Sequence, residues 1–318
     1  MVKHTAAARE LVYPGVEWAV ESPEAHGLDA ASLKRATAEI AEVEARYGLL
    51  VVKDGVIVHE HYYEGDATSQ HQIFSLTKGF GASLTGIAVT RGWLSVSDKV
   101  TDWLPYHTPE IMDGATIEHI LSMTAAQEPV GSNYEYTSGP VLNTLPNILW
   151  EASGMSPRDF YRQCLAEPLG LTLNWPSTDR GWMQIGNRGP MPVLTATHRD
   201  VARMGLLWLN RGSWGDQQLI GEEFVAAALR PPFPEANNAY GYLWWLNTPG
   251  GTWKTSRGAT GEGAWFPDAP ADMIVGIGAR GKLLYVLPSE NLLVVSMGET
   301  GAGGVHEVWA SIRRMLEA

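Results

Sequence analysis

The chain has 318 residues, of which 45% are hydrophobic and 18% are charged, with a formal net charge of −12 and a pI near 5.2. This composition excludes a disordered chain and supplies a sizeable core, and the length allows one large domain or two interleaved ones. The acidic balance argues against nucleic acid as a partner, because nucleic-acid-binding proteins carry basic stripes.

Cysteine content and the length of apolar runs bear on the cellular compartment. The single cysteine, Cys164, excludes an intramolecular disulfide, and its apolar helical surroundings predict a packed thiol. No stretch approaches the roughly eighteen-residue apolar run of a membrane span, and the opening stretch MVKHTAAARELVYPG has no run of signal-peptide length. We expect a soluble, cytoplasmic protein that binds no membrane, and we leave a homo-oligomer open.

The first part of the chain predicts a helix followed by two strands. Residues 28–46 carry apolar side chains at helical period, with Asp29 as a candidate N-cap. Two apolar runs then flank Lys53-Asp54-Gly55, and Asp-Gly between strands is a strong hairpin signal. His59 and His61 alternate on the second strand without a third ligand cluster nearby, so we predict a solvated strand face and no metal.

A serine and a lysine open the next predicted helix, which runs from Leu76 to Arg91. Ser75 and Lys78 are three residues apart, and such residues share one helix face about 5–6 Å apart. The ammonium can then reach the hydroxyl, and the helix N-terminus adds a positive field. Lys78 is the only one of the seven lysines with a serine three residues before it. A chance pairing is the alternative, because a short motif needs structural context.

The middle of the chain is predicted to be mostly helical. A loop at 124–136 brings Tyr136 to the start of a new helix, where it could face Ser75. A tyrosine can act as a general base if a neighbouring cation lowers its pKa from about 10. The helical patterns cover residues 116–123, 141–153, 156–166, 197–210 and 221–228.

After the aromatic stretch YGYLWW at 240–245, the pattern returns to strands. Apolar runs at 273–279, 282–288 and 291–297 are separated by turns, and a helix at 305–316 closes the chain. We therefore predict an α/β (α+β) fold whose sheet domain comprises residues 1–70 and 240–318. Residues 71–239 would form a helical lobe, with a ligand cleft between the two. Trp182, Trp244 and Trp245 are candidates for the pocket wall, with core packing as an equal alternative for each.

These motifs together resemble those of the penicillin-recognising serine hydrolases of the class C β-lactamase superfamily. The first motif is Ser75-Leu76-Thr77-Lys78, and the second is Tyr136-Thr137-Ser138, where the family has Tyr-x-Asn. The resemblance extends from about residue 30 to 316 in one consistent order and implies a β-lactamase-like fold. It implies that Ser75 is the nucleophile and that Lys78 and Tyr136 assist it. Either of these two could be the general base.

The third family motif, Lys-Thr-Gly or His-x-Gly on the strand lining the cleft, has two candidates. Lys254-Thr255-Ser256 lacks the glycine and lies in a polar, turn-rich stretch. Gly276-Ile277-Gly278 is followed by two more strands and the last helix, as the family order requires, and we prefer it. The resemblance then implies an oxyanion hole made by the backbone amides of Ser75 and Ala279. It also implies that Ser138, Gly276 and Gly278 bind the substrate.

Departures from the family pattern indicate a substrate class. The third motif has no cation and Ser138 replaces an asparagine, so the chain looks closer to the carboxylesterase and 6-aminohexanoate-oligomer hydrolase branch. The implied activity is hydrolysis of an ester or small amide through an acyl-Ser75 intermediate, without a cofactor. β-Lactamase or D-amino-acid peptidase activity is one alternative. A non-catalytic ligand-binding protein on this fold is the alternative of another class.

Residues 276–282 also match two nucleotide-binding patterns, GxGxxG and GxxxxGK. A dinucleotide motif must open a helix, but a strand is predicted here, and a phosphate loop needs Ser or Thr where Leu283 stands. We therefore predict no nucleotide. The sequence contains no GxSxG, which disfavours an α/β-hydrolase esterase.

Overall fold

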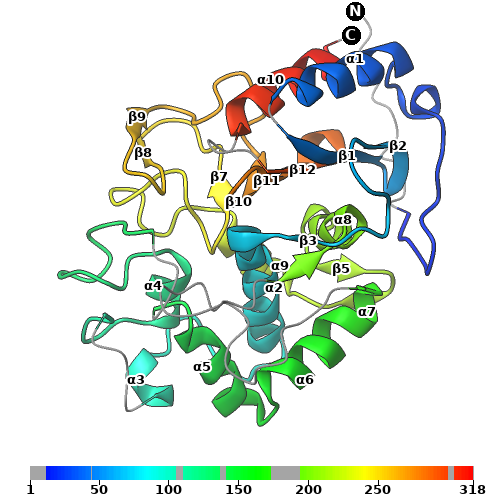
Figure 1. The fold of residues 1–318 in the computed structure, drawn as a ribbon. Coiled ribbons are helices and arrows are strands. Elements are labelled where there is room, and N and C mark those ends of the chain that lie inside the picture. The colour runs from blue at the N-terminus through cyan, green and yellow to red at the C-terminus, as the bar shows by residue number, and fades with distance from the viewer. Residues whose placement is uncertain are drawn as a thin grey trace, which may run out of the picture.

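The computed structural model describes residues 12–43, 45–104, 110–136, 141–172, 194–299 and 304–317. Its main feature is a six-stranded antiparallel sheet in the order β2-β1-β12-β11-β10-β7 (Figure 1). The predicted fold class is confirmed, because the strands come from both ends of the chain. Their bounds are Arg46–Lys53 (β1), Val56–Tyr62 (β2), Trp245–Leu246 (β7), Ile274–Gly278 (β10), Lys282–Leu287 (β11) and Leu292–Gly298 (β12).

The two ends of the chain meet in the pairing of β1 with β12. Leu50 on β1 lies opposite Val295 on β12 and, on the other side, opposite Glu60 on β2. The predicted hairpin between β1 and β2 is confirmed: Asp54 and Gly55 both have positive φ, 52° and 84°. Positive φ at both central residues is the requirement of the tight turns that match strand twist.

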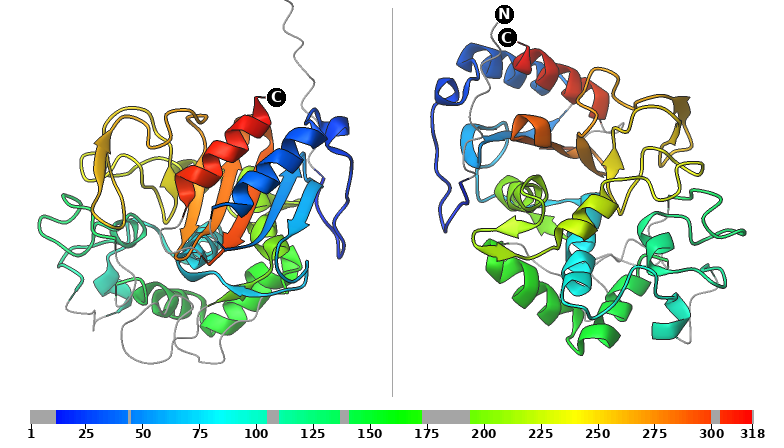
Figure 2. Two further views of the ribbon diagram at one scale, coloured as in Figure 1. Left: turned by 45° about the horizontal axis from the view of Figure 1, so that its top comes forward. Right: turned by 180° about the vertical axis from the view of Figure 1, so that it is seen from behind.

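Helices cover both faces of the sheet. Helices α1 (Ala30–Ala41) and α10 (Val305–Leu316) lie side by side across one face (Figure 2), and α8 (His198–Leu209) packs on the other. Every residue of β11 and β12 is buried as a result. This explains why the C-terminal runs are continuously apolar rather than alternating. The predicted cap of α1 is confirmed, since the Asp29 carboxylate accepts a hydrogen bond from the Ser32 amide.

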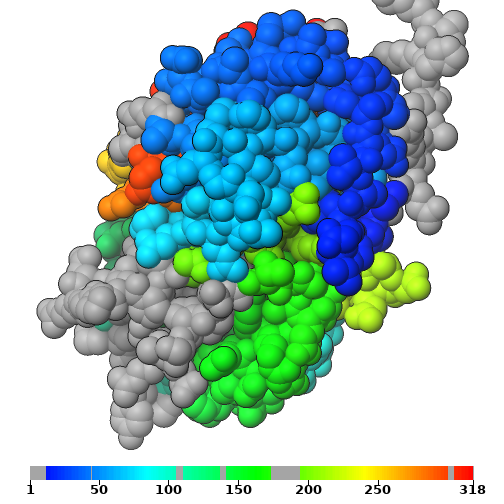
Figure 3. Space-filling view, turned by 45° about the vertical axis from the view of Figure 1, so that its right-hand side comes forward, coloured from blue at the N-terminus to red at the C-terminus, as the bar shows by residue number. Residues whose placement is uncertain are grey.

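The remaining helices lie mostly on the far side of α8 from α1 and α10, around the buried helix α2 (Thr77–Thr90). In the space-filling view the blue and cyan N-terminal segments pack directly against these green middle helices (Figure 3). The helices predicted in the middle of the chain are confirmed. Their bounds are Ile117–Leu121 (α4), Thr144–Ser153 (α5), Pro157–Tyr161 (α6) with its continuation Arg162–Ala166 (η3) and Glu167–Leu169 (α7), and Glu222–Ala228 (α9).

Several short elements escaped the sequence patterns, because two to four residues carry no detectable period. One of them matters for function: β3 (His71–Gln72) pairs with β4 (Thr195–Ala196) just before Ser75. The others are Pro23–His26 (η1), Val100–Trp103 (α3), Ser213–Trp214 (β5), Gln217–Gln218 (β6), Thr252–Lys254 (β8), Thr260–Glu262 (β9) and Pro288–Glu290 (η4).

The division of the chain at residues 70 and 240 stays a prediction. Helix α8 belongs by sequence to the segment assigned to the helical lobe, yet it contacts β1, β11 and β12. The sheet therefore depends on a helix from the middle of the chain to cover one of its faces.

Three smaller expectations are decided by the fold. Cys164 is buried with Arg91 Nη1 3.0 Å from its sulfur, so it is a packed thiol as predicted. His59 lies half-buried with its Nε2 2.7 Å from Thr37 Oγ1, so the predicted solvated strand face is wrong for His59 and holds for exposed His61. Within the described part of the chain, no helix is long and apolar enough to span a bilayer, and no His, Cys, Asp and Glu side chains gather as metal ligands would.

Candidate active site

Ser75 lies in a tight turn between β3 and the buried helix α2. The turn is η2 (Phe74–Leu76), and the Ile73 amide before it donates to the Leu194 carbonyl at 3.0 Å. Phe74 has φ of +47°, a left-handed conformation that is rare for a bulky side chain. Such conformations cost of order 1–3 kcal/mol and cluster at functional sites. The strained residue thus directly precedes Ser75, which is itself half-buried.

Lys78 is a buried cation in the first turn of α2. Twelve of the fourteen residues of this helix are buried, which fits its apolar composition on all sides. Lys78 is 2% exposed, and its Nζ donates to Ser75 Oγ at 3.0 Å. The sequence prediction that the i, i+3 spacing brings these two side chains together is therefore met.

Burial lowers the pKa of Lys78 to about 7. Taking an ammonium out of water disfavours its charged form, and no carboxylate in the described ranges forms an ion pair with Lys78. A large fraction of the lysine is therefore neutral amine at neutral pH. A general base is most effective when its pKa lies near the working pH.

Tyr136 completes the group around Ser75. Its ring centroid lies 4.5 Å from Lys78 Nζ, and its hydroxyl shares a hydrogen bond with the Ser75 side chain. Burial raises the pKa of Tyr136 to about 12, although the bond to Ser75 acts in the opposite direction. The condition for a tyrosine base, a pKa lowered by a neighbouring cation, is not met here, because burial is the largest influence on this pKa and raises it. The phenol stays protonated, which favours Lys78 as the base.

The two tryptophans of the 240–245 stretch have different positions. Trp245, 4% exposed, stacks on the Tyr136 ring with centroids 5.7 Å apart and an interplanar angle of 21°. Trp245 therefore packs against one face of the Tyr136 ring. Trp244 is fully buried against Trp208, and a Cβ added to Gly79 would touch its ring at 2.9 Å. Of the two roles considered for Trp244, its complete burial beside α2 favours core packing.

Strand β10 approaches the serine turn through its two glycines. A Cβ at Gly276 would lie 2.4 Å from Leu76 Cδ1, and one at Gly278 would lie 2.1 Å from the Ile73 carbonyl oxygen. The side-chain direction at both positions is thus filled by the turn that carries Ser75. Only glycine allows the strand to approach the turn this closely, and the substrate-binding role expected for the two glycines stays a prediction. Ala279, the next residue, is exposed.

The two candidates for the third motif also lie in different places. Gly276-Ile277-Gly278 is the part of β10 that packs on η2, whereas Lys254 belongs to the separate hairpin β8–β9 and Thr255 follows it. As predicted, residues 276–282 form a strand hairpin and open no helix. Ser138 and Trp182 lie outside the described residues, so their predicted roles stay predictions.

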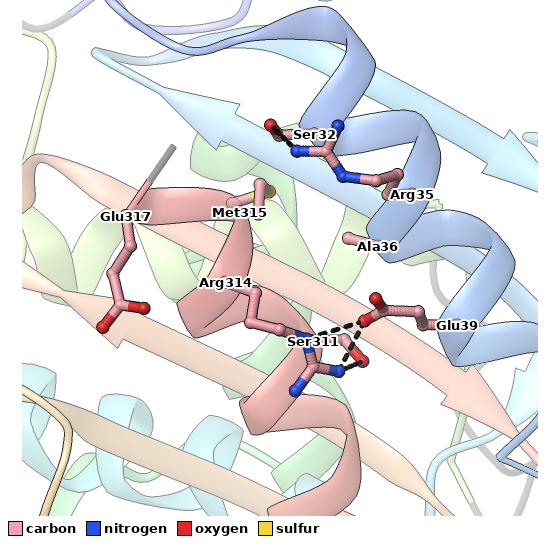
Figure 4. A pocket seen from close by; sticks show the side chains of 8 residues that line it. All are labelled: Ser32, Arg35, Ala36, Glu39, Ser311, Arg314, Met315 and Glu317. Atoms are coloured by element: carbon pink, nitrogen blue, oxygen red, sulfur yellow. Dashed lines mark hydrogen bonds and ion pairs between the residues drawn. The ribbon is translucent and has the colours of Figure 1, made fainter.

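Two cavities lie elsewhere in the described structure. One, of about 280 Å³, lies between α1 and α10, where Arg314 pairs with Glu39 and Arg35 bonds to Ser32 (Figure 4). The other, of about 410 Å³, includes Trp208, Leu246 and Ile274 in its lining. Ser75, Lys78 and Tyr136 belong to neither.

Comparison with known proteins identifies the family and the fold. The family model described as Beta-lactamase matches residues 36–301. Three solved structures share the fold. A putative beta-lactamase from Bacteroides dorei has a TM-score of 0.73 at 16% identity over 92% of this chain and 100% of its own. A putative 6-aminohexanoate-dimer hydrolase from Bacillus anthracis has a TM-score of 0.71 at 17% identity, over 97% of this chain and 89% of its own. EstCE1, a hydrolase with promiscuous acyltransferase activity, has a TM-score of 0.68 at 15% identity, over 91% of this chain and 98% of its own.

The pKa of Lys78 predicts how the reactivity of Ser75 depends on pH. Only the neutral amine can accept the serine proton, so labelling of Ser75 by a fluorophosphonate should rise with pH and level off above a midpoint near 7. Rates measured by intact mass from pH 5 to 10 test this. Lys78→Met should abolish the midpoint. A rate that keeps climbing to pH 10 in the parent would contradict a lysine base.

The close packing at Gly278 predicts a large cost for one methyl group. Gly278→Ala should lower the free energy of unfolding by about 1–3 kcal/mol, because the Ile73 carbonyl cannot move without displacing η2. Gly15→Ala is the control, since nothing lies within 4 Å of an added Cβ there. Urea denaturation compares the two. Equal stability of both variants would show that β10 does not press on the serine turn.

Proposed function

Because this chain belongs to the beta-lactamase family, we propose that it is a serine hydrolase that cleaves an ester or small amide through an acyl-Ser75 intermediate. The observation that carries the proposal is the 3.0 Å hydrogen bond between Ser75 and a lysine whose pKa is about 7. A serine hydroxyl needs an adjacent base to become a nucleophile at neutral pH. Neutral Lys78 is that base.

Acylation would then proceed with the protons conserved. Lys78 takes the Ser75 proton as Oγ attacks the carbonyl carbon of the substrate, and the Oγ–C bond forms. The protonated lysine lies 4.5 Å from the centre of the Tyr136 ring. The bond between the carbonyl carbon and the leaving oxygen or nitrogen then breaks as the Tyr136 hydroxyl donates a proton to the leaving alcohol or amine. The tyrosine regains a proton from Lys78. Water hydrolyses the acyl-serine by the same route in reverse.

The negative oxygen of the tetrahedral intermediate needs two N–H donors. We assign them to the backbone amides of Ser75 and Ala279, because the Gly278 backbone packs directly on the turn that carries Ser75. Removing one donor from such a hole typically costs about 3–4 kcal/mol. The hole would thus be assembled from two segments about two hundred residues apart in the chain.

Esters and small linear amides are the proposed substrates. The strand at the third-motif position presents Gly276 where classical β-lactamases carry a cation, so a site for a substrate carboxylate is missing there. The structural relatives include a putative 6-aminohexanoate-dimer hydrolase and EstCE1, a hydrolase with promiscuous acyltransferase activity, and these activities support the proposal. β-Lactamase and D-amino-acid peptidase activity are the alternatives, and a substrate panel with nitrocefin separates them.

Covalent labelling tests the nucleophile. A p-nitrophenyl ester or a fluorophosphonate should add one acyl or phosphonyl group to the parent protein, located at Ser75 by peptide mass spectrometry. Ser75→Ala should show no adduct and lose at least about a thousandfold in hydrolysis. The parent's failure to form an adduct or to hydrolyse any short ester, linear amide, cyclic amide or nitrocefin would support a binding protein instead.

Tyr136→Phe distinguishes the proposed role of Tyr136 as proton donor from the role of Lys78 as general base. If Tyr136 donates to the leaving group, the variant should lose about ten- to a hundredfold in kcat for amides and keep the pH midpoint near 7. Lys78→Met should lose about a hundred- to ten-thousandfold. Circular dichroism checks that both remain folded. Loss of the pH midpoint in Tyr136→Phe, with Lys78 intact, would assign the base role to the tyrosine.

A further inference from the structure

A second buried lysine lies behind the proposed oxyanion hole. The Lys282 side chain is 1% exposed, although it opens the otherwise apolar strand β11. Its Nζ donates to Glu299 Oε2 at 2.8 Å and to the carbonyls of Gly298 and Arg280, the latter at 3.3 Å. Lys282 is also the last residue of the GxxxxGK pattern. Because no nucleotide is predicted to bind there, nucleotide binding does not explain why this lysine is buried.

Two buried cations hold the turn that carries Ala279. The turn joins β10 to β11, and Gly278 pairs with Lys282 across its base. Lys282 bonds to the Arg280 carbonyl, and Arg46 Nη1 donates to the Gly281 carbonyl at 3.1 Å. Hydrogen bonds from charged donors are roughly twice as strong as neutral ones. The orientation of the peptide groups in this turn is therefore fixed from behind.

The same ammonium also contacts the serine turn. Lys282 Nζ lies 5.2 Å from the centroid of the Phe74 ring and 5.2 Å from that of Tyr47. A desolvated ammonium over the face of an aromatic ring is attracted by the negative face of its π-system. Phe74 immediately precedes Ser75 and has the strained φ of +47°. One buried cation thus contacts both turns that carry the proposed oxyanion donors.

The carboxylate of Glu299 anchors the ammonium. Burial alone would raise the pKa of Glu299, but hydrogen bonds from Lys282, Arg280 and Tyr47 outweigh it and lower the pKa to about 2. The carboxylate is ionised throughout the neutral range. The pair joins a buried ammonium to a carboxylate that is 35% exposed, and hydrogen bonds from Arg280 and Tyr47 hold that carboxylate in place.

We propose that Lys282 is a positioning residue that sets the spacing between the Ser75 and Ala279 amides. The inference rests on the proposed function, since it assigns these amides to the oxyanion hole. Lys282 does not touch the substrate. Its effect is exerted through Phe74 on one side and the 279–281 turn on the other. The alternative is an ion pair that serves only the stability of the fold.

Lys282→Met tests the proposal, with Tyr47→Phe as the matched control. Methionine keeps the length of the side chain and removes every ammonium contact. The control removes the 2.9 Å bond from Tyr47 to Glu299 and keeps the ring beside Lys282. Lys282→Met should lose about ten- to a hundredfold in kcat with KM within twofold, because a displaced donor costs less than a deleted one. Tyr47→Phe should keep kcat within about threefold.

Hydrogen exchange supplies a readout that is independent of turnover. Segments 73–77 and 278–283 should both exchange faster in Lys282→Met than in the parent. Their exchange rates should be unchanged in Tyr47→Phe. Unchanged exchange in Lys282→Met, or a parental kcat, overturns the proposal. If Lys282→Met does not fold, Glu299→Gln replaces it, with an expected kcat loss of about three- to tenfold and the same exchange pattern. If Ser75 of the parent protein is not labelled, the proposed function is overturned. Faster exchange in Lys282→Met would then show only that Lys282 stabilises the two turns.

Discussion

The site depends on the burial of one ammonium group without a compensating anion. Lys78 can lose its proton near neutral pH only because α2 is enclosed on almost every side and no described carboxylate forms an ion pair with it. If a carboxylate lay beside it, the pKa would rise and the amine would be charged when the serine needs a base. The core packing around α2 is thus a condition for the proposed chemistry as well as for stability.

The same enclosure sets the role of the aromatic side chains. Trp245 fixes the plane of the Tyr136 ring, and Trp244 fills the space that Gly79 leaves beside the first turn of α2. Both rings therefore pack against the segments that carry Tyr136 and Lys78. This packing explains why an aromatic-rich stretch at 240–245 is found next to a site built from polar groups.

Local rules predicted most of the fold and half of the site. The i, i+3 spacing of Ser75 and Lys78, the Asp54-Gly55 turn and the apolar C-terminal runs each follow from short-range geometry. The pKa order of Lys78 and Tyr136 did not follow, because desolvation depends on neighbours distant in sequence. The network around Lys282 was missed for the same reason, although a lysine opening an apolar strand was a visible signal.

The pairing of β1 with β12 has a consequence for biosynthesis. Strand β1 contacts a partner that leaves the ribosome about two hundred and forty residues later, and the first hairpin has an unpaired edge until then. Long-range pairings are slow to form, and exposed strand edges invite association between chains. Nascent chains of this protein therefore depend on the last fifth of the sequence to close the sheet. A chaperone that shields the β1 edge would act at this stage.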